Sequence, residues 1–197
     1  MKKLILLLLF IPLVSFGQVK NGEIKTYYDS GELESTVNYV DDLRQGEYKY
    51  YWKSGELQYT RNYVDGVMQG EYKYYHYKSE NLRYTVNYVD GLIQGEWKGY
   101  YKSGELQYTE NFIDGVRQGE TKAYYKSGNL KYTVNYVDDL KQGEWKFYYE
   151  SGELNSTANY VDDVQQGEFK FYYDSGELAS TGNYVDGLQQ GEYKAYL

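Results

Sequence analysis

The residue types that most often carry catalysis are scarce in this chain or repeat without distinction. Cysteine is absent and histidine occurs once, at His76, which excludes a thiol nucleophile and a histidine-built metal centre. Serines such as Ser54 and Ser103 recur at one place in a repeated segment, whereas a serine nucleophile needs a base held at one unique position. No single-copy pair of carboxylates stands out for glycoside cleavage. We therefore expect no enzymatic activity, no cofactor and no metal site.

Three pairs of neighbouring aspartates offer the oxygen ligands that a calcium ion uses. The pairs are Asp41-Asp42, Asp138-Asp139 and Asp162-Asp163. The glycine- and aspartate-rich spacing of calcium-loaded β-rolls is missing, however. Aspartate is also a common turn residue, because its short side chain tolerates the left-handed backbone region. We therefore interpret these aspartates as turn residues.

Aromatic side chains are the remaining candidates for a binding site, with 29 Tyr, 6 Phe and 3 Trp in 197 residues. Large rings repeat along one predicted sheet face, and small residues interrupt them between Trp97 and Trp145. Rings that flank missing side chains predict a groove, and hollowed aromatic surfaces are frequent ligand sites. The alternative is that the tryptophans fold over the small residues and fill the space. The candidate groove comprises Trp97, Gly99, Tyr108, Thr121, Ala123, Tyr132 and Trp145.

The elements that must position these residues come from one segment copied along the chain. A Gly-Glu-x-Lys motif begins each copy, and successive copies lie 24 residues apart except for one interval of 25. Seven full units and a half unit result, so residues 18–197 form one array without an interior linker. The units begin at Gly22, Gly46, Gly70, Gly95, Gly119, Gly143 and Gly167, and the half unit spans 191–197.

Within a unit the apolar pattern has a period of two, which predicts β-strands. In the unit at Gly143, Trp145 and Phe147 share one face, and Leu154 and Ala158 of the second half share one face. Ser-Gly between the halves, and Asp-Asp or Asp-Gly between units, are turn dipeptides. The predicted fold is all-β, an elongated single antiparallel sheet of tandem β-hairpins. At about 4.8 Å per strand, some fifteen strands extend about 70 Å.

Several polar positions never change between units, and they fall in rows on the opposite sheet face. These rows are Glu23 to Glu192, Lys25 to Lys194, Tyr27 to Tyr196, Thr36 to Thr181 and Asn38 to Asn183. Cross-strand Glu–Lys and Thr–Asn ladders would each contribute about 0.2–1 kcal/mol per pair. One interpretation is a regular surface for a repetitive ligand. The other, which we favour, is sheet stabilisation after recent duplication.

The unit at Gly70 departs from the pattern. It contains one extra residue in the segment 74–77, and Glu80-Asn81 replaces the usual turn with its glycine. Asn81 can adopt the left-handed conformation that glycine provides elsewhere, so we expect the hairpin to survive with a bulge. His76 is expected on the surface of this distorted turn.

Residues 1–17 have the pattern of a secretory signal peptide. Lys2 and Lys3 precede an apolar stretch over 4–14, and Ser15-Phe16-Gly17 places small residues before a cleavage site at Gln18. A retained membrane anchor is the alternative, but the apolar run is only half of the roughly 20 residues that a spanning helix needs. We therefore expect an exported chain, periplasmic or secreted, with no membrane insertion after cleavage.

The charge balance restricts the partners. The chain has 21 Lys+Arg against 29 Asp+Glu, a formal net charge of −8 and a pI near 4.8. Nucleic acids and anionic membrane surfaces select basic patches, so neither is expected as a partner.

The repeated unit resembles the MORN repeat (membrane occupation and recognition nexus), and it is most similar to the bacterial variant of that repeat. The resemblance covers 22–197 and rests on the Gly-Glu-Trp-Lys-x-Tyr-Tyr-x-Ser-Gly-Glu-Leu and Asn-Tyr-Val-Asp-Gly segments, with placements such as Gly95, Tyr101 and Gly104. It implies an elongated hairpin array used for binding or scaffolding. Proteins with the bacterial variant are often labelled antitoxins, which implies a toxin partner. The membrane binding in the family name is not expected here, because the chain lacks a basic face.

A fainter resemblance links the Tyr-Tyr-x-Ser-Gly segment to choline- and glucan-binding repeats of bacterial surface proteins, whose aromatic residues hold ligands. Those repeats have a shorter period and lack the Asn-Tyr-Val-Asp-Gly half. This resemblance supports only a carbohydrate hypothesis.

We expect an exported scaffold that binds another envelope or extracellular protein through its aromatic face. Tyr and Trp suit this function because they give contact area at small entropic cost. Two alternatives stay open: a glycan- or cell-wall-binding module in which Trp97 and Trp145 stack on sugars, and an antitoxin or immunity protein. Open end strands near Gly22 and Gly191 would also permit self-association.

Overall fold

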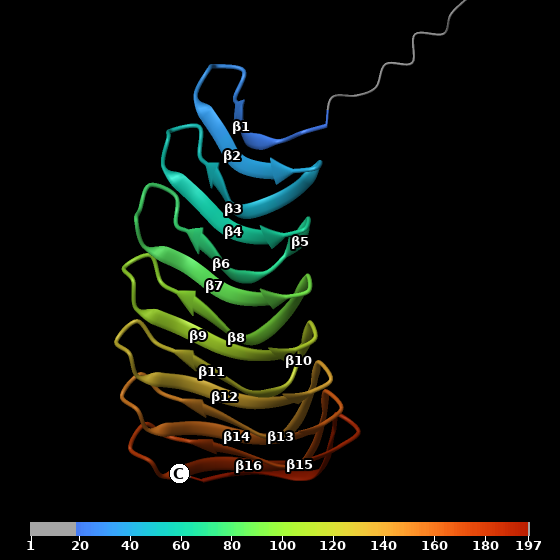
Figure 1. The fold of residues 1–197 in the computed structure, drawn as a ribbon. Coiled ribbons are helices and arrows are strands. Elements are labelled where there is room, and N and C mark those ends of the chain that lie inside the picture. The colour runs from blue at the N-terminus through green and yellow to red at the C-terminus, as the bar shows by residue number, and fades with distance from the viewer. Residues whose placement is uncertain (1–18, 197) are drawn as a thin grey trace, which may run out of the picture.

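The array folds into one open sheet of antiparallel strands. A computed structural model describes residues 19–196, so the leader predicted at 1–17 lies outside the described residues. Each strand pairs with its neighbours in the sequence, and the hairpins stack one above another into an elongated single layer (Figure 1). The strands are β1 (Gly22–Tyr27), β2 (Leu33–Val40), β3 (Leu43–Tyr51), β4 (Leu57–Val64), β5 (Val67–Met68), β6 (Gly70–Tyr75), β7 (Leu82–Val89), β8 (Leu92–Tyr100), β9 (Leu106–Ile113), β10 (Val116–Arg117), β11 (Gly119–Tyr124), β12 (Leu130–Val137), β13 (Leu140–Tyr148), β14 (Leu154–Val161), β15 (Val164–Tyr172), β16 (Leu178–Val185) and β17 (Leu188–Ala195).

The predicted fold class is confirmed. Gln69 separates the short β5 from β6, and Gln118 separates β10 from β11, so these four segments correspond to two of the expected strands. The end strands β1 and β17 each pair with one neighbour within 19–196, β2 and β16 respectively. Self-association through these edges stays a prediction. Residues 19–196 contain no helix that is long and apolar enough to cross a bilayer.

Both kinds of turn use the left-handed backbone that the sequence predicted. Within a hairpin, Gly152 has a φ of 100°, and its N–H donates to the carbonyl oxygen of Tyr149 at 3.0 Å. Between units, Asp162 and Asp163 have φ values of 49° and 66°. Two consecutive left-handed residues form the type I′ turn that matches the twist of adjacent strands. This geometry explains why only Asp-Asp or Asp-Gly occurs there.

The glycine that begins each unit bends the strand. In β13, Gly143 has a φ of 78°, which favours glycine over any residue with a side chain. Here Thr133 pairs with Lys146 and Asn135 with Gln142, so one residue of β12 faces three residues of β13. Such a bulge bends a strand and increases its twist. The strands are accordingly curved (Figure 1).

The two faces of the sheet carry different residues, as predicted, with one correction. Trp145 lies opposite Ala158 and Phe147 opposite Ser156, on a surface that we call the aromatic face. Leu154 was expected on that same face, but it pairs with Tyr148 on the opposite surface, which we call the polar face. The register shifts between Phe147 and Tyr148, and this second bulge moves Leu154 across the sheet.

The rows on the polar face are present, but their predicted pairing is wrong. Across the strands, Glu144 lies opposite Asn159 and Lys146 opposite Thr157. The ion pair forms instead within one strand, where the Lys146 Nζ is 2.9 Å from a carboxylate oxygen of Glu144. Residues two apart in a strand point to the same side, so these side chains meet without crossing to a neighbour.

Burial is shallow, as expected of a single layer. The most buried side chains, Val86 and Ala158, are each 1% exposed and lie on the aromatic face. Most of the rings around them remain half-buried. The aromatic face is therefore both the core of the protein and an accessible surface.

Candidate functional site

The aromatic face presents rings in continuous rows across the strands. Tyr50 stacks on Tyr59 with ring centroids 5.1 Å apart, and Tyr74 stacks on Tyr84 at the same distance. Neighbouring rings stabilise each other beyond the area that they bury. The rows position each ring rigidly, while the open side of the single sheet leaves its outer surface accessible.

The candidate groove is contiguous in the structure, but part of it is filled. Across the sheet, Gly99 pairs with Tyr108, Tyr108 with Ala123, and Ala123 with Tyr132. A Cβ atom on Gly99 would lie 2.1 Å from the Tyr108 ring, so this ring occupies the space that the missing side chain leaves. Ala123 is 6% exposed. At this point the space-filling alternative holds, although the ring that fills it is a tyrosine rather than a tryptophan.

Trp97 is packed closely among its neighbours. Its ring centroid is 5.2 Å from that of Tyr84 and 5.8 Å from that of Phe112. The indole Nε1 of Trp97 is buried without a hydrogen-bond partner in the described residues. Thr121, a further member of the candidate groove, is 3% exposed. These two residues therefore belong to the packed part of the face.

The other end of the candidate groove is hollow. A cavity of about 310 Å³ opens on the aromatic face over β12, β13 and β14. Two residues of the candidate set, Tyr132 and Trp145, line it. The remaining wall comes from Val134, Tyr136, Lys141 and Tyr160, which the sequence analysis did not select. Comparing position 141 with its counterparts in the other units could have found this lysine, because the position holds a cation in Arg44 and Arg117 but a neutral residue in Met68, Ile93 and Gln165.

The arginines of the chain lie on the aromatic face, each against rings of that face. The guanidinium carbon is 5.3 Å from the Tyr63 centroid for Arg44, 4.8 Å from Tyr48 for Arg61, 5.9 Å from Tyr74 for Arg83 and 4.2 Å from Tyr136 for Arg117. Such contacts stabilise a cation on a ring face. Although the net charge of the chain is −8, its arginines all lie on one face of the sheet.

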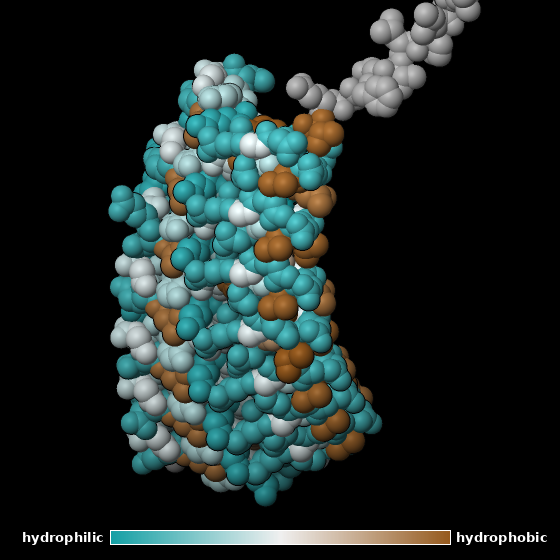
Figure 2. Space-filling model, viewed as in Figure 1, coloured by the Kyte–Doolittle hydropathy of each residue, from teal (hydrophilic) through white to brown (hydrophobic). Residues whose placement is uncertain are grey.

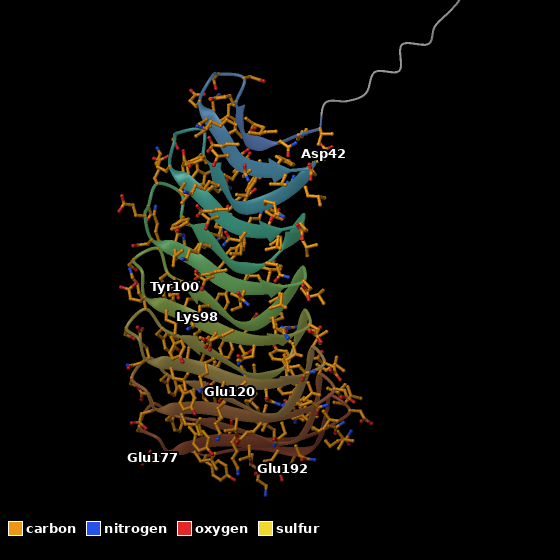
Figure 3. The ribbon with its side chains drawn as sticks, in the orientation of Figure 1. Asp42, Lys98, Tyr100, Glu120, Glu177 and Glu192 are labelled. Atoms are coloured by element: carbon orange, nitrogen blue, oxygen red, sulfur yellow. The ribbon has the colours of Figure 1, made fainter. Side chains whose placement is uncertain are left out.

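The lysines of the polar face are neutralised by their own strands. In seven strands the conserved Lys forms an ion pair with the conserved Glu, with N–O distances between 2.7 and 3.1 Å. The hydrogen bond to Glu96, for example, raises the pKa of Lys98 above its usual value. Figure 3 shows Lys98 close to Tyr100, the last residue of β8, and Asp42 at the opposite edge of the sheet. The polar face therefore offers charge pairs rather than free charges.

Two carboxylates reach the aromatic face: Glu34, which accepts a hydrogen bond from the Tyr50 hydroxyl at 3.0 Å, and Glu110. Glu110 lies opposite Trp97, at a position where other units have Val86, Val134 or Ala158. Burial raises the pKa of the Glu110 carboxyl above its ordinary value, and the nearby Arg117 only partly offsets this. The sequence analysis did not select Glu110 or Arg61. These two residues occupy the same position in their units, and they are the only charged residues at that position in the seven units.

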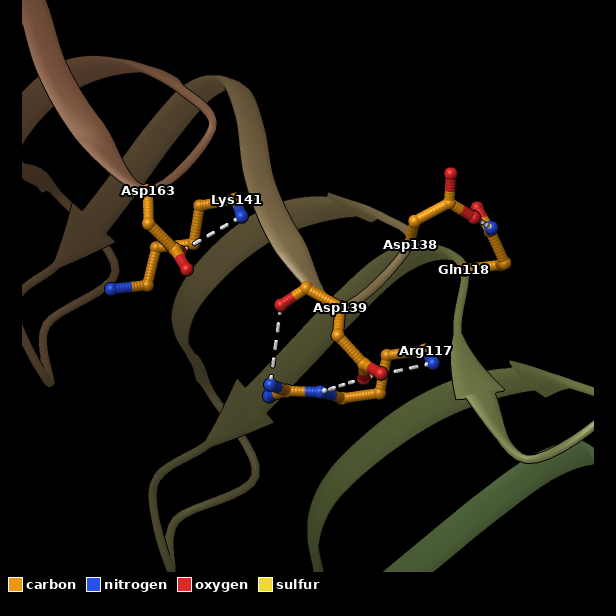
Figure 4. Close-up of polar contacts among 6 residues, drawn as sticks. All are labelled: Arg117, Gln118, Asp138, Asp139, Lys141 and Asp163. Carbon is orange, nitrogen blue, oxygen red and sulfur yellow. Dashed lines mark hydrogen bonds and ion pairs between the residues drawn. The ribbon is translucent and has the colours of Figure 1, made fainter.

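The edge with the Asp-Asp and Asp-Gly turns carries a second exposed surface. Asp139 accepts hydrogen bonds from the backbone N–H and the Nε of Arg117, each at 3.0 Å, and Asp163 accepts one from the backbone N–H of Lys141 at 2.9 Å (Figure 4). Gln118 donates to the other aspartate of the same turn, Asp138. These contacts fix each turn to the preceding unit, which supports the turn interpretation of the aspartates.

Exposed aliphatic residues follow the same edge, and Figure 2 shows them as a row of hydrophobic patches along the molecule. The row, here called the apolar stripe, consists of Val40, Leu43, Val64, Val67, Val89, Leu92, Ile113, Val137, Leu140, Val161, Val164, Val185 and Leu188. Regular rows of exposed apolar side chains are a feature of interaction surfaces. The sequence analysis did not single out this stripe.

The irregular unit keeps its contact with the next unit through a different side chain. In five other units a tyrosine donates its hydroxyl to a backbone carbonyl one unit further on, as Tyr101 does to Tyr124 at 2.8 Å, whereas Trp52 takes this position in the unit at Gly46. His76 takes this position, with its Nε2 3.0 Å from the carbonyl oxygen of Tyr100. It is half-buried, so the expectation of a simple surface residue was wrong in this respect.

The extra residue of this unit has a packing partner. The Tyr77 ring packs edge-on against Trp52, with centroids 5.0 Å apart. An open cavity of about 570 Å³ beside it is lined by Glu56, Leu57, Tyr75, Lys78, Ser79 and Glu80. Most of that lining consists of polar turn residues, so this cavity is a cleft between turns. Over 19–196, no three His, Cys, Asp or Glu side chains lie together in a way that would hold a metal ion.

Fold and site together define a tandem β-hairpin scaffold built from one open sheet. Comparison with protein-family models identifies the unit: the MORN repeat variant matches residues 20–41, 44–65, 93–114, 117–138, 141–162 and 165–186. These matches cover more than half of the sequence, and the chain therefore belongs to the MORN repeat variant family. The irregular unit falls in the gap between 65 and 93.

Other comparisons add little. No curated protein matches the chain significantly. One solved structure, titled "Crystal structure of GtfA/B complex bound to UDP and GlcNAc", matches with 18% identity and a TM-score of 0.19 over 63% of this chain. The match spans 22% of that protein's chain. A similarity this weak carries no argument about function.

Proposed function

We propose that this protein is an exported, non-enzymatic scaffold that binds another envelope or extracellular protein through its aromatic face. One observation carries the proposal: half-exposed rings and every arginine of an acidic chain meet on this face. Tyr, Trp and Arg are the side chains most enriched at the energetic centres of protein interfaces. The partner would present apolar groups together with carboxylates.

The rings suit this function because they are already ordered. Tyr50, Tyr59 and Tyr74 hold one another in stacked rows, so binding costs little side-chain entropy. The guanidinium of Arg44 is oriented by the hydroxyls of Tyr39 and Tyr63, at 3.4 and 3.3 Å. A preorganised cation of this kind can pair with a carboxylate on the partner.

The test compares two charge reversals of equal size on opposite parts of the surface. Arg44→Glu/Arg83→Glu changes the aromatic face, whereas Lys53→Glu/Lys102→Glu changes exposed turn lysines. Tagged chain beginning at Gln18 is used to capture proteins from envelope extract and culture medium, and the captured protein is then purified for affinity measurement. We expect the first variant to lose binding and the second to retain it. Equal binding by both variants, with both folded, would refute the aromatic face as the interface.

Export is tested separately. Fractionation of the native host, followed by sequencing of the mature N-terminus, is expected to place the chain outside the cytoplasm with Gln18 as its first residue. A cytoplasmic chain that retains Met1 would remove this part of the proposal.

A further inference from the structure

The cavity at Trp145 combines ring walls with one cation. Tyr132, Tyr136, Trp145 and Tyr160 supply the rings, and Val134 forms the floor at 4% exposure. The ring centroids of Trp145 and Tyr160 are 6.4 Å apart in an edge-on arrangement, with interplanar angle 77°. The cavity volume of about 310 Å³ lies at the lower end of the range for small-molecule sites. It fits one ring-sized group whose remainder extends into solvent.

Lys141 is the cation of this cavity. Its Nζ lies 5.2 Å from the centroid of the Tyr160 ring. Its backbone N–H is bound to Asp163, but no salt bridge within 19–196 involves its ammonium group. By contrast, the neighbouring Arg117 is paired with Asp139 at 3.0 Å. The Lys141 ammonium is therefore available to an anion that enters the cavity.

The chain contains a natural comparison for this cavity, 48 residues earlier. The six lining positions correspond there to Tyr84, Val86, Tyr88, Ile93, Trp97 and Phe112. Only two positions differ, because Ile93 replaces Lys141 and Phe112 replaces Tyr160. In the earlier copy Trp97 packs on both Tyr84 and Phe112, and Val86 is 1% exposed.

Trp145 and Trp97 pack differently, and the cause lies in their own strands. Trp145 lies beside Phe147 in the same strand, with ring centroids 6.0 Å apart. The residue that corresponds to Phe147 in the earlier copy is Gly99, which the Tyr108 ring covers. Trp145 thus leans on a neighbouring ring in its own strand, whereas Trp97 packs across strands. The cation occurs in the copy whose tryptophan lines a cavity.

We infer that the cavity at Trp145 binds an acidic sugar, a pyranose ring that carries a carboxylate. The C–H faces of a pyranose pack on aromatic ring faces, and its hydroxyls pair with phenolic hydroxyls, which both donate and accept. The carboxylate meets the Lys141 ammonium in a charge-assisted hydrogen bond. This function goes beyond the protein partner proposed above and does not depend on it.

The phenol groups stay in the form that this binding needs. Burial raises the pKa of Tyr132 and of Tyr160 above the ordinary value, so both remain protonated donors near neutral pH. An aspartate or glutamate side chain of a peptide would also reach the ammonium, but it has no ring to cover Trp145. Ring walls around a single cation therefore favour the sugar over the peptide.

The test uses two sugars that differ only in the charged group. Methyl β-D-glucuronide carries a carboxylate where methyl β-D-glucoside carries a hydroxymethyl group. Binding to the mature chain is measured by saturation-transfer-difference NMR and by tryptophan fluorescence. We expect the glucuronide to bind about tenfold or more tightly than the glucoside, because one charge-assisted hydrogen bond is gained.

Variants connect this difference to the cavity. Lys141→Ile copies the natural Ile93 and is expected to reduce glucuronide binding to the level of the glucoside. Lys141→Arg keeps the charge and should retain the preference, and Lys102→Ile, an exposed turn lysine, should change nothing. Trp145→Phe, which copies Phe169, should weaken both sugars.

Two outcomes would overturn the inference. The first is binding of neither sugar by a folded chain; if a short glutamate-containing peptide binds in that case, the result would instead agree with an acidic protein partner. The second is an unchanged preference in Lys141→Ile. Circular dichroism of each variant excludes loss of fold as the cause.

Discussion

At the scale of single residues, the aromatic face is held by side chains whose size is matched across the strands. Gly99 is the clearest case, because the Tyr108 ring lies where any side chain would be. Its φ is not in the left-handed region, so glycine is needed here for space rather than for backbone conformation. Gly143, by contrast, is required for its φ of 78°.

Gly99→Ala is expected to destabilise the protein by about 1–3 kcal/mol, because the new methyl group forces the Tyr108 ring out of its position. Urea denaturation measures the free energy of unfolding. Gly182→Ala is the matched control, since its Cβ would lie 3.1 Å from the Tyr193 ring, a milder contact. A larger loss in Gly182→Ala would contradict this account of the packing.

Glu110 predicts a pH dependence. Its folded-state pKa lies above the unfolded value because of burial, so ionisation opposes folding. The stability is greatest below the unfolded pKa and is lost as the pH rises through the folded pKa. Glu110→Gln should therefore raise the melting temperature near pH 7, and the gain should disappear at about pH 3.

The control for this change is Glu120→Gln, which removes an exposed carboxylate that pairs with Lys122 at 2.8 Å. Exposed pairs contribute little, so we expect a small effect without the same pH pattern. If Glu110→Gln instead lowered the melting temperature near neutral pH, attraction to Arg117 would outweigh the cost of burial.

At the scale of elements, successive hairpins are joined by the same few contacts. In five of the hairpin turns a tyrosine hydroxyl donates to a carbonyl oxygen of the next unit, as from Tyr149 to Tyr172 at 2.7 Å. The aspartate of each connecting turn binds the preceding unit, as Asp163 binds Lys141. His76 maintains the same link in the irregular unit, which explains how the array accepts an extra residue without losing its register.

Removal of one such hydroxyl should loosen one junction. Tyr149→Phe is expected to cost about 0.5–1.5 kcal/mol, the net contribution of one hydrogen bond. Chemical denaturation measures the total loss of unfolding free energy. Hydrogen exchange should show reduced protection where the hairpin of β13 and β14 meets the hairpin of β15 and β16. Tyr148→Phe, the neighbouring ring on the polar face, is the control. Equal losses in both variants would indicate a packing effect instead of a hydrogen bond.

At the scale of the whole molecule, stability arises from contacts between neighbouring strands. The sheet is one layer, and even its most buried residues lie close to solvent on the aromatic face. Such arrays behave as sums of units and junctions. The two faces also divide the charge, with ion pairs on one and arginines against rings on the other.

Deletion of residues 143–166, one whole unit, should leave a folded array. Two strands are lost, so small-angle scattering should show a particle shorter by about 10 Å. The free energy of unfolding should fall but not vanish. Deletion of 143–165 instead leaves one extra residue, Gln166, inside a strand rather than in a turn as in the irregular unit, and the resulting shift of register is expected to disrupt folding. Complete unfolding after both deletions would show that the array depends on a core spanning all units.

Much of the fold could be predicted because the sequence repeats a simple physical pattern. Alternation with a period of two indicates strands, and Asp-Asp or Asp-Gly at regular intervals indicates turns. The face of Trp145 and Phe147 followed directly from this alternation. The position of Leu154 did not, because a bulge shifts the register and local sequence carries no clear signal for it.

The sequence by itself determined the repeat, its strands, its turns and the presence of an aromatic face, since each depends on residues close together in the chain. Only the tertiary structure decided that Tyr108 closes the space at Gly99, that Lys141 stands beside the cavity at Trp145, and that the arginines gather on one face. These features depend on which side chains of adjacent strands pack against one another. Such pairs are about 10 to 25 residues apart in the sequence, and the alternation of residues within one strand does not specify them.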